Sequence, residues 1–177
     1  MHLDTSAELM ARIVASIVPV RDAIPLRQVL AEDFPRDCMH LPIAGGWGYS
    51  QDDAIRFVKS EFRGPLDFVG LEYHIAQKLL YEQLIIFRRS GEKFSGIDHK
   101  LVKQRLVFAD ERQFDCLTFE VHCWTEQHWN ALSQEWTDSA FGTAPEFDQA
   151  EHFRRREAAR VSYVREFWFD ITELWVS

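Results

Sequence analysis

Two stretches of the chain alternate between apolar and polar side chains with a period of two residues. They run from Phe114 to Trp124 and from Val161 to Ile171. A period of two places successive side chains on opposite faces of a β-strand, so it constrains both stretches to a sheet. The second stretch carries aromatic rings on both faces, which is typical of a strand in a central position.

A further run at 101–108 alternates in the same way and lies just before the first stretch. This arrangement predicts a β-hairpin over residues 101–124. The apolar run near 84–88 predicts a buried strand, and 161–171 adds another. Because hairpins pair antiparallel strands, we expect an α+β fold with a mostly antiparallel sheet, in a single domain spanning residues 1–177.

Amphipathic helices are expected to cover this sheet, because several segments show helical spacing or helix caps. Ser50 is expected to cap a helix that begins at Gln51, with Asp53 in the reciprocal capping position. Over 71–83 a helix and a strand both remain open. The predicted helices lie at 9–17, 26–31, 51–58, 69–84, 125–136 and 149–159.

The charge balance argues against several classes of partner. The chain has 28 acidic and 20 basic residues, a formal charge of −8 that repels phosphate backbones and anionic lipids. Glu151 and Glu157 flank the basic triplet Arg154 to Arg156, which favours a solvated helix face. No stretch reaches the roughly 20 uncharged apolar residues of a membrane-spanning helix. We expect a cytoplasmic protein that binds neither nucleic acid nor membranes.

The cysteines and histidines give no sign of a metal or disulfide framework. Cys38, Cys116 and Cys123 are odd in number and lack C-x-x-C spacing, which favours reduced thiols. The seven histidines form no H-E-x-x-H motif or comparable pair. The sequence therefore predicts no metal site and no cofactor.

A glycine-rich segment at 45–48 is the most distinctive local motif. It precedes the helix expected at Gln51, whose first amides could hold an anion. The segment has neither the P-loop pattern nor the dinucleotide-binding pattern, so a tight turn is the simpler interpretation. In a ligand-binding loop, Trp47 and Tyr49 would form the walls of the pocket, and they are candidate ligand-binding residues.

Two pairs of residues have the chemistry of acid–base catalysis. Glu72 and His74 lie in the segment where a helix and a strand are both open, and Glu120 and His122 share one side of a predicted strand. All four are candidate catalytic residues. The alternative is that they belong to solvated faces, where such residues are common.

Two basic residues of the hairpin are further candidates for binding a ligand. Counting across the turn places Lys103 and Arg105 near Thr118 and Glu120 on the polar face of the sheet. Cross-strand ion pairs in water are again the alternative.

These observations favour a small acidic cytosolic protein of bacterial type that is a non-enzymatic binding or protein-interaction domain, in the manner of immunity or antitoxin proteins. Acidity and abundant aromatic anchors are typical of such domains. The alternative is a small-molecule-binding protein or enzyme with an aromatic-lined pocket and His/Glu acid–base groups. A structural subunit of a larger particle is a third hypothesis. The partner is a protein or a small molecule, and the chain is a monomer or a homodimer.

Overall fold

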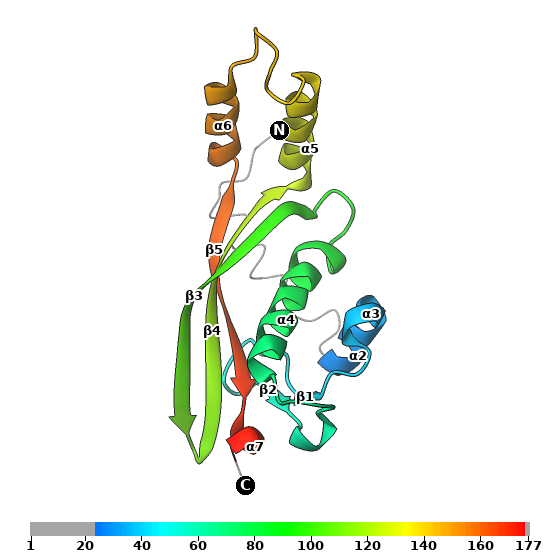
Figure 1. Cartoon of the computed structure of the whole chain (residues 1–177), viewed down its shortest axis with the longest axis vertical. Helices are drawn as coiled ribbons and strands as arrows, with labels where there is room; N and C mark the ends of the chain where they lie inside the picture. Colours follow the sequence, from blue (N-terminus) through cyan, green and yellow to red (C-terminus); the bar gives the residue numbers. More distant parts are fainter. Residues whose placement is uncertain (1–23, 176–177) are drawn as a thin grey trace. The chain divides into compact units, whose positions relative to one another are not determined.

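One sheet of five strands organises the part of the chain that the computed structural model describes, residues 24–175 (Figure 1). The strand order is β1-β2-β5-β4-β3, and all neighbours are antiparallel except β2 and β5. The strands are β1 (Ile43–Gly45), β2 (Ile55–Phe57), β3 (Phe94–Ala109), β4 (Arg112–Thr125) and β5 (Val161–Asp170). The predicted α+β class and mostly antiparallel sheet are confirmed.

Helices connect these strands, and α4 is the longest helix within residues 24–175. The α-helices are α2 (Leu26–Asp33), α3 (Pro35–Cys38), α4 (Phe68–Tyr81), α5 (Glu126–Asp138), α6 (Gln149–Ala158) and α7 (Thr172–Trp175). A 3-10 turn, η1 (Lys59–Glu61), precedes α4, and a π-helical turn, η2 (Glu82–Ile86), follows it. No helix in the described residues is both long enough and apolar enough to cross a membrane.

The described residues divide into two compact units. Unit 1 contains 83–100 and 120–163, and unit 2 contains 24–82, 101–119 and 164–175. Strands β3, β4 and β5 each pass from one unit to the other along the chain. A single domain remains a prediction.

Aromatic rings build the core of unit 2. Tyr73 of α4 packs edge-on against Phe119 of β4 with ring centroids 6.0 Å apart, and Phe119 packs against Phe167 of β5 at 6.1 Å. Phe57 of β2 stacks on Phe169 of β5 at 5.8 Å. Phe57, Phe119, Phe167 and Phe169 are at most 1% exposed. α4 therefore covers one face of the sheet, as the helical spacing of its apolar residues requires.

Unit 1 packs α5 and α6 close to the end of β4. Thr125 caps α5, because its side chain accepts a hydrogen bond from the His128 amide. Trp124 and Trp129 pack with ring centroids 5.3 Å apart, and Leu132 is buried. The helices predicted at 125–136 and 149–159 are thus confirmed.

The helix predicted from Gln51 is wrong, because β1 and β2 form a short antiparallel hairpin with 46–54 as its loop. Ser50 Oγ accepts a hydrogen bond from the Asp53 amide, and Asp53 Oδ2 accepts one from the Tyr49 amide. A capping box would have the second bond donated by the Ser50 amide, but here Tyr49 donates it and the two bonds close a turn. Gly48 has a φ of +83°, which glycine adopts without strain.

The strand predicted near 84–88 is also wrong. α4 continues at Glu82 in the right-handed helical region and passes directly into η2. An apolar run of four residues has the same appearance in a buried strand and in a buried helical turn, so the pattern alone could not separate them.

The remaining strand predictions are confirmed. The hairpin predicted at 101–124 forms as β3 and β4, with β3 starting seven residues earlier, at Phe94. The strand predicted at 161–171 forms as β5 and lies in the centre of the sheet. Over 71–83 the helix, and not the strand, is found up to Tyr81. The helix predicted at 9–17 lies outside the described residues.

Candidate functional site

The structure separates the catalytic candidates Glu72 and His74. Both belong to α4, but residues two apart on a helix point to different sides. Glu72 is completely buried beside Asp115 of β4, whereas His74 lies beside Cys38 of α3. The two side chains therefore do not form one acid–base pair.

Glu72 and Asp115 form a buried pair of carboxyl groups in unit 2. Gln104 donates a hydrogen bond to Asp115 Oδ2, whereas within residues 24–175 neither oxygen of Glu72, nor Asp115 Oδ1, has a hydrogen-bond partner. Burial, together with the neighbouring Asp115, raises the pKa of Glu72 to about 9, and burial also raises the pKa of Asp115. A proton retained on Glu72 prevents two like charges from facing each other in the interior.

His74 belongs to a second cluster, between α3 and α4. Its Nε2 lies 3.7 Å from Cys38 Sγ, and one turn further Lys78 binds Asp37 at 2.8 Å. A cysteine beside a histidine is the arrangement of a thiol nucleophile. However, Cys38 has no exposed surface, and burial raises the pKa of its thiol to about 11. The geometry thus gives a protonated thiol that a substrate cannot reach.

The other two cysteines are equally inaccessible. Cys116 and Cys123 are free and have no exposed surface. Burial raises the thiol pKa to about 11 for Cys116 and to about 12 for Cys123. All three cysteines of the sequence are therefore buried, protonated thiols, and Cys116 Sγ accepts a hydrogen bond from Arg105 at 3.3 Å.

Glu120 and His122 share one side of β4 in unit 1, as predicted. His122 Nε2 lies 3.8 Å from Glu120 Oε1, and His122 Nδ1 lies 2.8 Å from the Ser162 hydroxyl. Glu120 is partly exposed, so this contact is a partly solvated cross-strand network. Neither residue lines the cavity between α5 and α6 or the cavity at the start of α4.

The candidate ring walls Trp47 and Tyr49 pack into unit 2. Their rings stack with centroids 6.4 Å apart in the β1–β2 loop, and the Arg165 guanidinium lies 4.7 Å from the Tyr49 ring. Trp47 is only 9% exposed. These rings therefore contribute to packing on the sheet.

Lys103 and Arg105 differ in their surroundings. Lys103 is exposed on β3. Arg105 donates to Glu166 at 2.9 Å, and Thr118 donates to the same carboxylate, which confirms the predicted neighbourhood of Arg105 and Thr118. Both partners of the ion pair are more than a third exposed, so it contributes little to stability.

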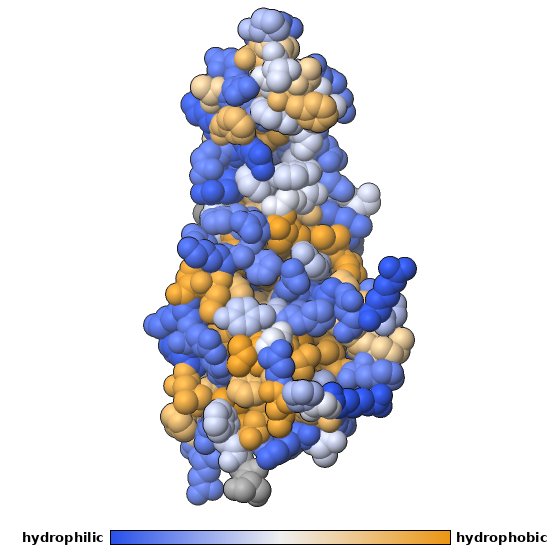
Figure 2. All heavy atoms as spheres, viewed as in Figure 1, coloured by the Kyte–Doolittle hydropathy of each residue, from blue (hydrophilic) through white to orange (hydrophobic). Residues whose placement is uncertain are grey.

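A groove between α5 and α6 is the most aromatic cavity described in unit 1. Its volume is about 450 Å³. Trp129, Trp136 and Leu132 line it from α5, and His152 and Phe153 line it from α6. Trp136 lies 5.4 Å from the His152 ring and 5.5 Å from the Phe153 ring, centroid to centroid. We call this cavity the aromatic groove; pale and orange spheres lie among blue ones over α5 and α6 (Figure 2).

The arginine triplet of α6 is only partly a solvated face. Arg154 makes two hydrogen bonds of 2.7 Å to Glu151, and Arg155 binds Glu135, which lowers the pKa of that carboxyl group. Arg156 instead lines the aromatic groove, with its guanidinium 5.2 Å from the Trp124 ring and 5.4 Å from the Trp129 ring. No carboxylate in the part of the chain that is described pairs with Arg156.

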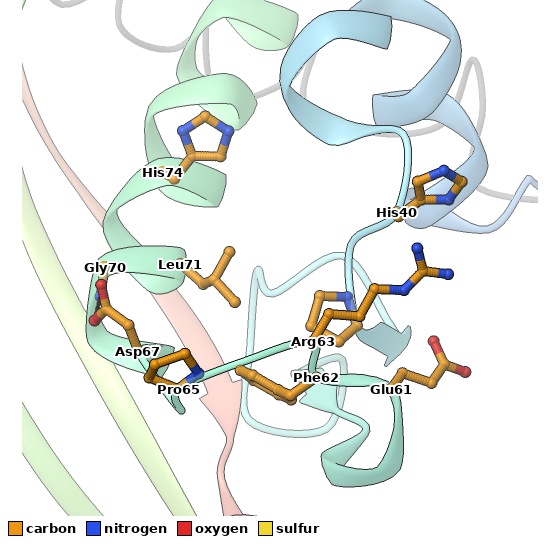
Figure 3. A pocket seen from close by; sticks show the side chains of 10 residues that line it. His40, Glu61, Phe62, Arg63, Pro65, Asp67, Gly70, Leu71 and His74 are labelled. Atoms are coloured by element: carbon orange, nitrogen blue, oxygen red, sulfur yellow. Dashed lines mark hydrogen bonds between the residues drawn. The ribbon is translucent and has the colours of Figure 1, made fainter.

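A second cavity, in unit 2, lies between the start of α4 and the segments around β1 and η1 (Figure 3). Its volume is about 490 Å³. His74 is the one catalytic candidate on its wall. We call it the α4 cavity. It is lined by His40, Pro42, Glu61, Phe62, Arg63, Pro65, Asp67, Gly70, Leu71 and His74.

Sequence reasoning missed both cavities. The helix predicted at 125–136, which carries Trp129 and Trp136, was expected to cover the sheet. Its helical spacing shows that the two rings share a side but not what lies opposite them. The spacing of His152, Phe153 and Arg156 on one side of α6 is the signal that could have indicated the groove. Within residues 24–175, no three His, Cys, Asp or Glu side chains gather closely enough to hold a metal ion.

Comparison of the chain with protein-family models, with curated proteins and with solved structures finds no significant match. The function must therefore be argued from these cavities.

Proposed function

We propose that this chain is a non-enzymatic binding protein that recognises an acidic segment of a partner protein in the aromatic groove. The observation that carries the proposal is Arg156, a cation held over two tryptophan rings at the groove with no carboxylate partner among the described residues. Tryptophan and arginine are the residues that most often dominate the binding energy of protein interfaces.

The groove selects for two properties in its ligand. Its wall of Trp129, Trp136 and Phe153 favours a large apolar side chain, which it would remove from water. Arg156 favours a carboxylate next to that side chain, because a guanidinium forms paired hydrogen bonds with carboxylates. A segment with Asp or Glu beside an aromatic or aliphatic residue meets both conditions.

The overall charge sets the range over which this recognition acts. At −8 the chain repels an acidic segment at long distance, so the attraction must come from Arg156 at short range. The same charge supports the exclusion of nucleic acid as a partner. Three reduced, buried thiols support a cytoplasmic location.

Selection from a displayed library of random 12-residue peptides tests the proposal. We expect the enriched peptides to carry an acidic residue next to a large apolar residue. In fluorescence anisotropy, Arg156→Ala should weaken their binding by about tenfold or more, because a hydrogen bond between charged groups contributes about 1.5–3 kcal/mol. Arg154→Ala is the matched control on the same helix and should change the affinity by less than about twofold.

Three results would contradict this function: enrichment of basic peptides, no enrichment at all, or equal losses in the two variants. Arg156→Lys keeps the charge and the helix, so it separates a loss of recognition from a loss of folding. Light scattering over a range of concentrations tests whether a second copy of the chain fills the groove. If the chain forms a dimer and Trp136→Ala dissociates it, the ligand of the groove is a second copy of the chain and not a peptide of another protein.

A further inference from the structure

The α4 cavity in unit 2 combines an apolar floor with a basic wall. Leu71, Phe62 and Pro65 supply apolar surface, and Figure 3 shows Arg63 and His40 on one side of the cavity with Leu71 and His74 across from them. On the face shown in Figure 2, orange side chains also gather around the lower end of α4. A volume of about 490 Å³ falls in the range in which proteins bind small molecules.

The acidic residues of the cavity are already committed. Glu61 Oε2 binds Arg27 at 2.6 Å, and Asp67 Oδ1 accepts a hydrogen bond from the Gly70 amide as the cap of α4. In contrast, neither Arg63 nor His40 has a polar partner within residues 24–175. Arg63 and His40 also line an adjoining cavity of about 330 Å³, so they stand where the two meet.

We propose that the α4 cavity binds a small organic carboxylate with an apolar body. Arg63 holds the carboxylate as a bidentate partner, with His40 beside it, and Leu71 and Phe62 contact the apolar part. A divalent cation is the rival ligand, but the described residues offer no group of three ligands for one. This site lies in a different unit from the aromatic groove and does not depend on the function proposed there.

Nuclear magnetic resonance of the full ¹⁵N-labelled chain tests the site with three ligands that share a phenyl ring and differ in charge. Benzoate carries the carboxylate, benzamide is neutral, and benzylamine is cationic. Because Arg63 and His40 are exposed to solvent, we expect dissociation constants of roughly millimolar size for benzoate, with shifts at the Gly70 and Leu71 amides. Benzamide should bind at least about fivefold more weakly, and benzylamine should cause no shifts at these amides.

Arg63→Met keeps an unbranched apolar stem and removes the guanidinium and its charge, so it should weaken benzoate binding at least about fivefold. Arg89→Met, at an exposed position of unit 1, is the matched control and should bind benzoate as the unmodified chain does. Benzamide binding as strongly as benzoate would overturn the proposal. So would an unchanged affinity in Arg63→Met, or no shift at Gly70 and Leu71 with roughly 20 mM benzoate.

Discussion

Replacing Gly96 by alanine is expected to lower the free energy of unfolding by about 2–5 kcal/mol. Gly96 lies near the start of β3 with a φ of +62°, and a left-handed conformation costs an alanine about 1–2 kcal/mol. A Cβ atom there would also lie 2.2 Å from the Trp129 ring. That ring packs against Trp124, so it cannot move aside without disturbing unit 1, and such overpacking costs about 1–3 kcal/mol more.

Gly91→Ala is the matched control for this prediction. Gly91 has a φ of +85°, but no atom lies within 4 Å of the place its Cβ would occupy. Only the conformational cost applies, so this variant should lose about 1–2 kcal/mol. Urea unfolding followed by tryptophan fluorescence measures both changes. Equal losses in the two variants would show that Trp129 does not pack over Gly96.

The second large effect concerns pH, and it arises from the buried Glu72. Its pKa of about 9 in the folded chain lies far above the value of about 4.3 in an unfolded chain. Between these two pH values the folded chain binds more protons than the unfolded chain. The contribution of Glu72 to the free energy of unfolding is therefore complete below pH 4.3 and is lost as the pH rises towards 9. From pH 6 to pH 8 we expect the free energy of unfolding to fall by about 1–3 kcal/mol.

Glu72→Gln removes this titration while keeping the shape of the side chain. The variant should be more stable than the unmodified chain at pH 8, and its stability should change less between pH 6 and pH 8. Glu92→Gln, at an exposed position, should follow the unmodified chain. Urea unfolding at pH 6, 7 and 8 checks these differences. If the free energy of unfolding changes with pH equally in Glu72→Gln and in the unmodified chain, Glu72 is ionised in the folded chain.

The strands were predictable where burial sorts side chains over a long stretch. In β5, Val161, Tyr163, Phe167 and Phe169 are buried at every second or fourth position, as the alternation in the sequence requires. In β4 burial alternates only from Phe119 to Cys123, because residues 114–119 are all buried. The run near 84–88 has only a few residues, and its hydrophobicity records burial without recording the backbone conformation. The helix predicted from Gln51 was wrong for a different reason. Side chains such as Ser50 and Asp53 form the same kind of hydrogen bond to the backbone in a turn as at the start of a helix.

The cavities were not predictable, because they depend on which helices meet. The sequence shows that Trp129 and Trp136 share one side of α5, but not that His152 and Phe153 of α6 lie opposite them. Likewise, Cys38 and His74 are 36 residues apart, so their contact has no local signal. Residues that are close in sequence can also lie apart in space, as Glu72 and His74 do on α4.

Because every cysteine is buried, the rate at which a thiol reagent labels each one measures how often the surrounding structure unfolds. A thiol reagent such as iodoacetamide needs a thiolate that it can reach, and neither condition holds for these cysteines in the folded chain. Alkylation must therefore wait for a fluctuation that exposes the sulfur atom. Because Cys123 belongs to unit 1 while Cys38 and Cys116 belong to unit 2, their separate labelling rates would show whether the two units open together or one at a time.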